Sequence, residues 1–313
     1  MDEASNQSVV MLFPGALGDL LLALPALRAL RRRHAGAHTT LAVGGWLREL
    51  AVHTEVADVY ASLDDADTAG LFGGTRVPRW FGCRPAVYGW LGRDDPAVRA
   101  RLGELAAAVQ LFAVERGEGT THAATAYARQ IGLEGTPDGL AAAGRLRAPR
   151  SRRAAELVTG LRRPVLVVHS GAGSEAKRWA PTGFAAVADA WRRAGGEVVH
   201  VTGPADSALP RFGGAVPVVE WALPDVAALL ASADAYVGND SGISHLAAAV
   251  GTRGVVVFGP TAARRWKPMG DAVVAVEGAC RTAEGISLEA VSVATVVDAM
   301  RCTVRLPAGD ERP

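Results

Sequence analysis

Cysteine is scarce in this chain of 313 residues, which contains only Cys83, Cys280 and Cys302. Three widely spaced cysteines do not make a disulfide framework, and none of them has the CxxC spacing of a metal or redox site. We therefore expect a reducing compartment, the cytoplasm. A core position without chemistry is one interpretation of Cys280 and Cys302, whose roles the sequence leaves open.

Long apolar runs are absent as well. No uninterrupted apolar stretch approaches the roughly 20 residues that cross a bilayer. The first residues, MDEASNQ, are acidic and polar, whereas a secretion signal is basic and apolar. The sequence predicts a soluble protein, or one that touches the inner face of the cell membrane only peripherally.

Lysine is the rarest charged residue, since Lys177 and Lys267 are the only lysines among 33 basic residues. An ammonium is a compact point charge and a guanidinium is a planar fork, so the two are not interchangeable. Each lysine is therefore either a chance remnant or a site residue, and the motif around Lys177 favours a site there. Lys267, in RRWKPMG, is a hypothesis only. The net charge of +1 gives no general reason to expect a nucleic-acid partner.

What the chain does contain is an alternation of short apolar runs with alanine- and leucine-rich stretches of helical length. This pattern is typical of βα units around a parallel sheet, and it predicts the α/β class. It begins with VVMLF and begins again with PVLVVHSGAG, after an arginine-rich stretch at 138–163 that we interpret as a linker. We expect two domains, 1–150 and 151–313.

The stretch PGALGDLLLALPAL, residues 14–27, follows the first predicted strand directly. Gly15 and Gly18 bracket a tight turn, and Asp19 stands where a helix begins. A carboxylate there can accept backbone N–H groups or point into the space above the sheet. The spacing is not GxGxxG, and the stretch alone fits a simple helix cap equally well.

A loop of small residues follows the strand that opens the second half. Its amides can approach an anion, and Lys177 follows within reach of the same space. GxxxxGK[ST] is absent, which disfavours P-loop ATP hydrolysis. Trp179 is expected to pack the turn against the next helix. The loop residues are Ser170, Gly171, Gly173 and Ser174.

The stretch AYVGNDSGISHLAAAVG, residues 235–251, reads as a strand, a turn and a helix. The helix N-terminus presents amides at the carboxyl edge of the sheet, which favours anion binding. Each polar residue also has a plain structural interpretation: Asp240 or Ser241 as a cap, and His245 as a packed helix residue.

In order and separation, GDLLLALPAL, GAGSEAKRWAP, GNDSGISHLAAAVG and FGPT resemble the glycosyltransferase family that contains the bacterial ADP-heptose:lipopolysaccharide heptosyltransferases, family 9. The resemblance implies a GT-B fold, in which two Rossmann-like domains with parallel sheets face each other across a cleft. The first domain would hold the acceptor and the second the nucleotide sugar. It also implies an inverting transfer that needs no metal and no cofactor besides the donor substrate.

The resemblance implies a role for the residues that match its motifs. Asp19 is similar to the base that takes the proton of the acceptor hydroxyl, and Lys177 to the cation that neutralises the diphosphate. The amides of Ser241 and Gly242 would share that charge.

Other donor residues follow from the same resemblance. Asp240 is similar to a ligand of sugar hydroxyls, and His245 to a residue that holds the turn or a phosphate. Asp206, in VTGPADSA, would bind the ribose hydroxyls, and Trp221 would border the base. An aspartate at 206 in place of glutamate leaves the nucleotide open between ADP and others.

The acceptor side is carried by fewer signals. Gly18 lies beside the predicted base, and the stretch 72–90 combines arginines with aromatic residues, among them Arg79, Trp80 and Arg84. Arginine suits a carboxylate or phosphate on the acceptor. The same stretch also fits a loop that packs on its own domain, or a patch that rests on a membrane surface.

The sequence thus favours an enzyme that transfers heptose, or a related sugar, from ADP-heptose to a sugar hydroxyl of a lipopolysaccharide core or another glycoside. One alternative keeps the fold but uses a soluble secondary-metabolite acceptor, an aminocyclitol or nucleoside, or another nucleotide sugar. A second is a non-catalytic sugar-binding module. A nicotinamide oxidoreductase is disfavoured, because neither glycine turn has the GxGxxG spacing.

Overall fold

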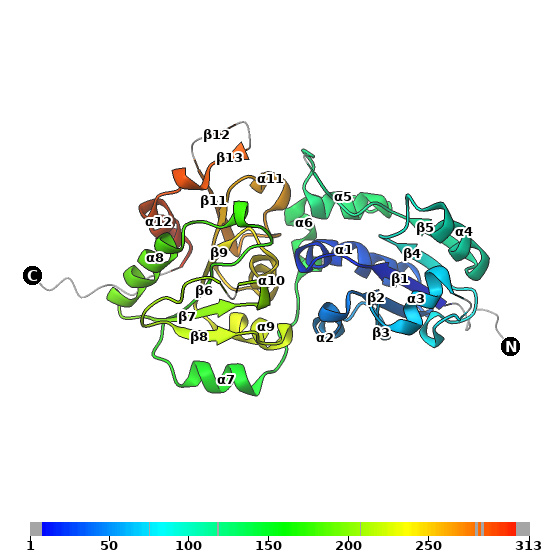
Figure 1. The fold of residues 1–313 in the computed structure, drawn as a ribbon, viewed down its shortest axis with the longest axis horizontal. Helices are drawn as coiled ribbons and strands as arrows, with labels where there is room; N and C mark the ends of the chain where they lie inside the picture. Colours follow the sequence, from blue (N-terminus) through cyan, green and yellow to red (C-terminus); the bar gives the residue numbers. More distant parts are fainter. Residues whose placement is uncertain are drawn as a thin grey trace, which may run out of the picture. The chain divides into compact units, whose positions relative to one another are not determined.

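The computed structural model describes residues 8–74, 76–117, 119–206, 208–278, 281–282 and 285–304. The chain forms two compact units, which Figure 1 shows in the colours of the sequence. The first contains 1–117 and 124–135, and the second contains 118–123 and 136–313. The short segment 118–123 therefore groups with the second unit, although the first unit continues after it.

The first unit is built on a five-stranded sheet of order β3-β2-β1-β4-β5, in which every pair is parallel. The strands are β1 (Ser8–Phe13), β2 (His38–Val43), β3 (Val59–Ser62), β4 (Ala86–Gly89) and β5 (Ala108–Leu111). The helices are α1 (Leu17–Arg33), α2 (Arg48–Ala51), α3 (Ala66–Gly73), α4 (Pro96–Leu105) and α5 (Ala123–Gln130).

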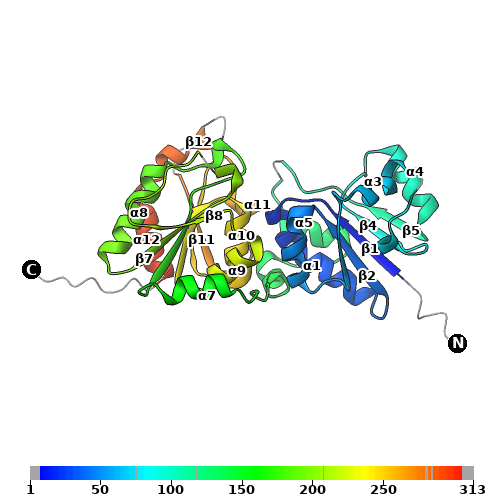
Figure 2. The same cartoon turned by 60° about the horizontal axis from the view of Figure 1, so that its bottom comes forward.

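Helices cover both faces of this sheet. Leu71 of α3 and Leu102 of α4 share one buried cluster with Val10 and Leu12 of β1. Helices α1 and α5 lie on the other face (Figure 2). A strand buried on both sides explains why VVMLF is a continuous apolar run and not an alternating one.

The second unit is built on a six-stranded parallel sheet of order β11-β10-β9-β6-β7-β8. Its strands are β6 (Val165–His169), β7 (Glu197–Thr202), β8 (Val216–Val219), β9 (Ala235–Asn239), β10 (Gly254–Phe258) and β11 (Val273–Glu277). Its main helices are α6 (Pro137–Ala141), α7 (Arg152–Thr159), α8 (Pro181–Arg193), α9 (Leu223–Ser232), α10 (Gly242–Val250), α11 (Ala263–Trp266) and α12 (Val293–Thr303). The small pair β12 (Arg281–Thr282) and β13 (Gly285–Ile286) is antiparallel. Helices α8 and α12 pack on one face of the sheet, and α9 and α10 lie on the other (Figure 2).

The stretch 138–163 is not the plain linker expected from its composition. It contains the rest of α6 and the whole of α7, whose N-terminus is capped by the Ser151 side chain on the Ala154 amide at 3.1 Å. The Leu146 amide donates to Ala249 O of α10 at 2.9 Å. These contacts place residues 136–150 with the second unit and not with the first, where the expected boundary at 150 had put them.

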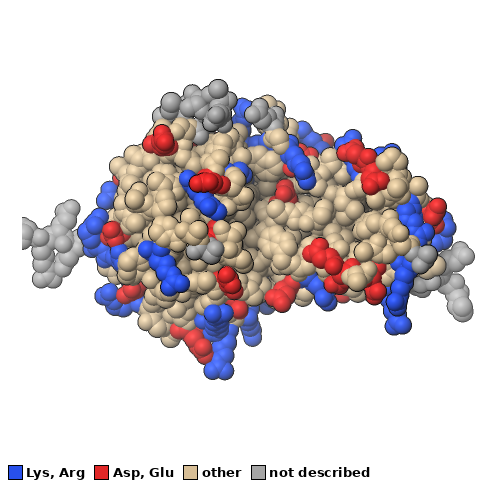
Figure 3. All heavy atoms as spheres, in the orientation of Figure 1, with Lys and Arg blue, Asp and Glu red and all other residues tan. Residues whose placement is uncertain are grey.

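Three general properties complete the description of the fold. Within the five-stranded and the six-stranded sheet all strands are parallel, so the loops that follow the strands gather at one edge of each sheet, the carboxyl edge. On the face drawn in Figure 3, acidic and basic side chains are interspersed, in keeping with the net charge of +1. No helix within the described residues is long and apolar enough to cross a membrane.

Candidate functional site

The turn between β1 and α1 places Asp19 at the carboxyl edge of the first sheet. A Cβ at Gly15 would overlap the Phe13 ring, so only glycine fits at this step of the turn. Helix α1 begins at Leu17 with Ala16 as its N-cap, and Gly18 and Asp19 lie in its first turn. Asp19 is thus not the N-cap, and its half-buried carboxylate lies where the helix dipole favours negative charge.

Tyr127 of α5 hydrogen-bonds to this carboxylate. Its hydroxyl donates to Asp19 Oδ1 at 2.9 Å and accepts the Glu115 amide at 3.2 Å. Burial, the charge of Asp19 and the hydrogen bond to it all raise the pKa of Tyr127. The phenol is therefore a proton donor to Asp19 at neutral pH.

The acceptor residues predicted at 79–84 lie elsewhere in the first unit. Arg79 and Trp80 form a 3₁₀ turn before β4, and a Cβ at Gly82 would lie 3.3 Å from Ser8 Oγ, at the start of β1. This is the amino edge of the sheet, one strand length away from the turn that carries Asp19. Arg79 and Arg84 are exposed and Trp80 packs on the core, so the structure does not bring these side chains to Asp19.

In the second unit, the loop of small residues after β6 has a buried first part and an exposed second part. Ser170 and Gly171 are buried, and the Ser170 hydroxyl pairs with His200 Nε2 at 2.9 Å. A Cβ at Gly171 would overlap the carboxyl group of Asp206. Gly173 and Ser174 are exposed. Only the later part of this loop is thus open to a ligand.

Trp179 closes the loop as expected. It is buried, its amide donates to Asn239 Oδ1 at 2.9 Å, and its indole packs edge-on against Phe184. The indole N–H donates to Val291 O at 3.1 Å. The packing role predicted for Trp179 is confirmed.

Lys177 comes next to the motif after β9. Its ammonium donates to Asp240 Oδ2 at 2.8 Å, and the Thr261 hydroxyl donates to the same oxygen at 2.6 Å. The side chain of Asp240 is 7% exposed and that of Lys177 is 31% exposed. The ion pair thus places the Lys177 ammonium at the carboxyl edge of the sheet, with part of the lysine side chain exposed. The FGPT segment supports Asp240 through Thr261.

The N-terminus of α10 lies beside this ion pair. Ser241 is the N-cap and Gly242 the first helical residue, so their amides have no acceptor within the helix. His245, one turn further, is buried. Burial lowers its pKa to about 4; the charge of Asp240 opposes this shift, and the charges of His122 and Lys177 add to it. His245 is therefore neutral at pH 7 and does not add positive charge for a phosphate.

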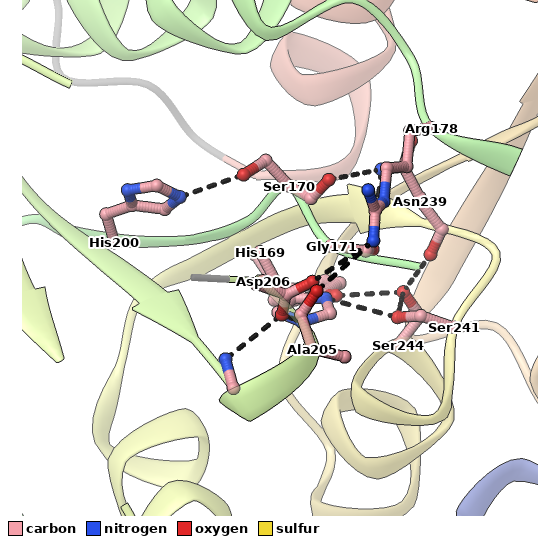
Figure 4. A network of polar contacts seen from close by, with 12 residues as sticks. His169, Ser170, Gly171, Arg178, His200, Ala205, Asp206, Asn239, Ser241 and Ser244 are labelled. Atoms are coloured by element: carbon pink, nitrogen blue, oxygen red, sulfur yellow. Dashed lines mark hydrogen bonds and ion pairs between the residues drawn. The ribbon is translucent and has the colours of Figure 1, made fainter. Parts of the chain in front are cut away.

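Asp206 is a buried member of a network shown in Figure 4. Its Oδ2 accepts the Gly203 amide at 3.0 Å and lies 3.4 Å from His169 Nε2, and the Ser241 hydroxyl pairs with His169 Nδ1 at 3.2 Å. Burial alone would raise the pKa of Asp206, but His169, the Gly203 amide and the Arg178 charge together lower it. The carboxylate predicted for ribose hydroxyls is thus engaged in orienting His169.

Trp221, predicted near the base, follows β8 at the same edge and is half-buried. The Arg153 guanidinium lies 4.2 Å from its ring centroid, a cation–π contact with the start of α7. One face of the indole is thereby covered by Arg153.

Lys267 is half-buried, and its carbonyl accepts a hydrogen bond from His122 Nε2 at 2.8 Å. Burial lowers the pKa of His122; the hydrogen bond to the Lys267 carbonyl opposes this shift, and the Lys267 charge adds to it. Cys302 is exposed, so it is not a core residue. Cys83 is exposed as well. Cys280 lies outside the described residues.

The structure therefore brings together Lys177, Asp240, Ser241, Gly242 and His245. Thr261, His169 and Tyr127 also contribute to these arrangements, although none of the three was predicted as a site residue from the sequence. His169 could have been found from its place directly before Ser170. Tyr127 gives no local signal, because 108 residues separate it from Asp19.

Comparison with known proteins supports the family. The model of glycosyltransferase family 9 (heptosyltransferase) matches residues 104–289. No curated protein matches the chain in sequence.

Among solved structures, a family 9 glycosyltransferase from Veillonella parvula has a TM-score of 0.76 at 20% identity, with 96% of this chain and 98% of that chain covered. ADP-heptose lps heptosyltransferase II of E. coli has a TM-score of 0.68 at 19% identity, with 95% and 98% covered. E. coli heptosyltransferase WaaC, solved with ADP, has a TM-score of 0.63 at 17% identity, with 94% and 99% covered. The fold is thus the GT-B type of these enzymes. The chain belongs to glycosyltransferase family 9 and is a heptosyltransferase-like glycosyltransferase.

Proposed function

We propose that the enzyme transfers heptose, or a closely related sugar, from ADP-heptose to a sugar hydroxyl of a lipopolysaccharide core or another glycoside. The transfer would invert the anomeric centre and need no metal. The observation that carries this proposal is the Lys177–Asp240 pair beside the N-terminus of α10, in a chain of family 9.

Charge supports the donor half of the proposal. A departing nucleoside diphosphate develops negative charge on its β-phosphate, and an ammonium and helix amides fixed in advance stabilise it. Lys177 is fixed by Asp240, which is itself held by Thr261. Two solved relatives point to the nucleotide, since one is named for ADP-heptose and another was solved with ADP.

The position of Asp19 supports the acceptor half of the proposal. The acceptor oxygen would attack the anomeric carbon while its proton passes to the Asp19 carboxylate, and the bond from that carbon to the phosphate oxygen would break, with its electron pair leaving on ADP. A positioned base of this kind contributes roughly 10²- to 10⁴-fold in rate. A single displacement inverts the configuration.

Calorimetric titration with ADP, UDP, GDP and NAD tests the donor. We expect selective ADP binding that Lys177→Ala weakens about tenfold or more, as for the loss of a charge-assisted contact. Lys267→Ala is the matched control, because it removes the only other lysine of the chain. Preference for UDP or GDP would keep the family and replace the donor. NAD binding without any nucleoside diphosphate affinity would overturn the donor assignment.

Turnover with ADP-heptose then tests the acceptor. A heptose-deficient lipopolysaccharide is compared with soluble aminocyclitol and nucleoside acceptors by ADP release. Transfer to the lipopolysaccharide supports the first acceptor class. Transfer only to a soluble acceptor would overturn the lipopolysaccharide as acceptor and support the soluble acceptor class.

A further inference from the structure

The hydroxyl of Tyr127 donates a hydrogen bond to the carboxylate of the proposed base, at 2.9 Å from Asp19 Oδ1. We propose that Tyr127 is a positioning residue that fixes the orientation of the Asp19 carboxylate for proton abstraction. This inference rests on the proposed function, in which Asp19 is the base.

Tyr127 is itself held in place. Its side chain is 0% exposed, and its ring packs edge-on against Phe13 with centroids 5.8 Å apart. Phe13 ends β1, and Asp19 follows six residues later in the first turn of α1. The ring that carries the hydroxyl is thus packed on the strand that carries the turn.

The direction of the hydrogen bond is determined by the neighbours of the phenol. The Glu115 amide donates to Tyr127 Oη at 3.2 Å, so one lone pair of that oxygen is occupied. Its single proton then goes to Asp19, a carboxylate that accepts and does not donate when ionised. Glu115 is the second acidic group near this hydroxyl.

A second set of hydrogen bonds holds the Glu115 side chain. Gln130 Nε2 donates to Glu115 Oε1 at 2.9 Å, and Trp90 Nε1 donates to Gln130 Oε1 at 2.7 Å. Trp90 and Tyr127 are fully buried. Gln130 of α5 and Trp90 at the end of β4 thus fix the loop after β5. This keeps the Glu115 amide within hydrogen-bonding distance of the Tyr127 hydroxyl.

Two consequences follow for Asp19. A bond to one carboxylate oxygen restricts rotation of the carboxyl plane, and base catalysis depends on that geometry first. The bond also stabilises the ionised form, which keeps the carboxylate deprotonated at lower pH.

The first test compares Tyr127→Phe with Tyr88→Phe, using the donor and acceptor that give turnover. Tyr88 is a matched control: it is also buried in the first unit, and its hydroxyl pairs with His34 Nε2 at 2.8 Å and not with Asp19. We expect kcat to fall about 10- to 100-fold in Tyr127→Phe, the loss for a bond to a charged group, with the donor KM unchanged. Tyr88→Phe should stay within about twofold of wild type. Equal kcat values for the two variants would overturn the inference.

The second test needs no turnover. The side-chain carboxyl of Asp19 is titrated by carbon-13 NMR, with its resonance assigned by loss in Asp19→Asn. Its midpoint should rise by about one pH unit in Tyr127→Phe and stay constant in Tyr88→Phe. If Tyr127→Phe does not fold, incorporation of 3-fluorotyrosine, a stronger donor, should lower the midpoint instead. A midpoint that does not move removes the inference.

The two failures can be told apart. An Asp19→Asn enzyme with full turnover would remove the base from the proposed function, whatever Tyr127 does. An inactive Asp19→Asn enzyme together with a fully active Tyr127→Phe enzyme would leave the proposed function standing and remove only the role of Tyr127.

Discussion

Gly171 and Gly173 differ in the space around them, although they lie two residues apart in one loop. A Cβ at Gly171 would overlap the Asp206 carboxyl group, whereas a Cβ at Gly173 would meet nothing within 4 Å. Gly171→Ala should lower the free energy of unfolding by about 1–3 kcal/mol, because neither the buried carboxylate nor the loop can move away without losing hydrogen bonds. Gly173→Ala should stay within about 0.5 kcal/mol of wild type. Urea unfolding measures both, and equal values would contradict the packing of Asp206 on this loop.

His200 gives the second unit a pH-dependent stability. Burial lowers its pKa to about 4 from 6.5; the charge of His169 adds to this and that of Asp206 opposes it. Between pH 6.5 and 4, the unfolded imidazole binds a proton and the folded one does not, so its stabilising contribution is complete above pH 6.5 and is lost as the pH falls towards 4. The loss amounts to about 3 kcal/mol at most.

His200→Gln tests this, since the glutamine amide can still pair with the Ser170 hydroxyl. We expect the free energy of unfolding to fall less between pH 7 and 4.5 in the variant than in wild type, by about 1–2 kcal/mol. Chemical unfolding at several pH values measures the difference. Parallel curves would show that His200 does not carry this dependence.

At the scale of elements, α10 is joined to β9 by a buried serine. Ser244 donates to Asn239 O at 2.5 Å and pairs with the Tyr236 hydroxyl at 2.8 Å. Ser244→Ala leaves the Tyr236 hydroxyl without this partner, which should cost about 1–3 kcal/mol of stability. It should also weaken ADP binding about 2- to 10-fold, because the amides at the start of α10 lose their fixed direction.

Ser232→Ala is the control for α10. Ser232 lies on α9, and its hydroxyl donates to Ala228 O within the same helix at 2.8 Å. We expect unchanged ADP affinity in this variant by calorimetry. A Ser244→Ala protein with wild-type affinity would separate the anchoring of α10 from nucleotide binding.

The elements were more predictable than their contacts. VVMLF, PVLVVH and TRGVVVF are apolar runs bounded by turn residues, and each contains a strand with neighbours on both sides in its sheet. The composition of 138–163 did not indicate α7, because the Ser151 cap and the buried Ala154 and Val158 of that helix outweigh the arginines in deciding local structure. Lys177 and Asp240 could be expected near each other from the sequence. Each follows a predicted strand, and the loops after parallel strands share one edge of the sheet. The hydrogen bond from Tyr127 to Asp19 could not be predicted from the sequence, because it depends on how α5 packs beside a turn 108 residues earlier in the chain.

At the scale of the whole molecule, the question is where positive charge for the leaving group comes from. Within the described residues, no group of three or more His, Cys, Asp or Glu side chains is placed to hold a metal ion. Asp240 Oδ2 already accepts from Lys177 and Thr261. In the proposed transfer, the Lys177 ammonium and the first amides of α10 supply this charge.

We accordingly expect EDTA to leave turnover within about twofold, since no step of the proposed transfer uses a metal. ADP release before and after chelation, with magnesium added back, is the measurement. The Lys177→Ala variant makes this test more discriminating. It should lose most of its turnover, and added magnesium should restore a part of that turnover by supplying positive charge to the same diphosphate. Loss of wild-type activity on chelation, with recovery on adding magnesium, would contradict the metal-independent mechanism while leaving the chain in its family.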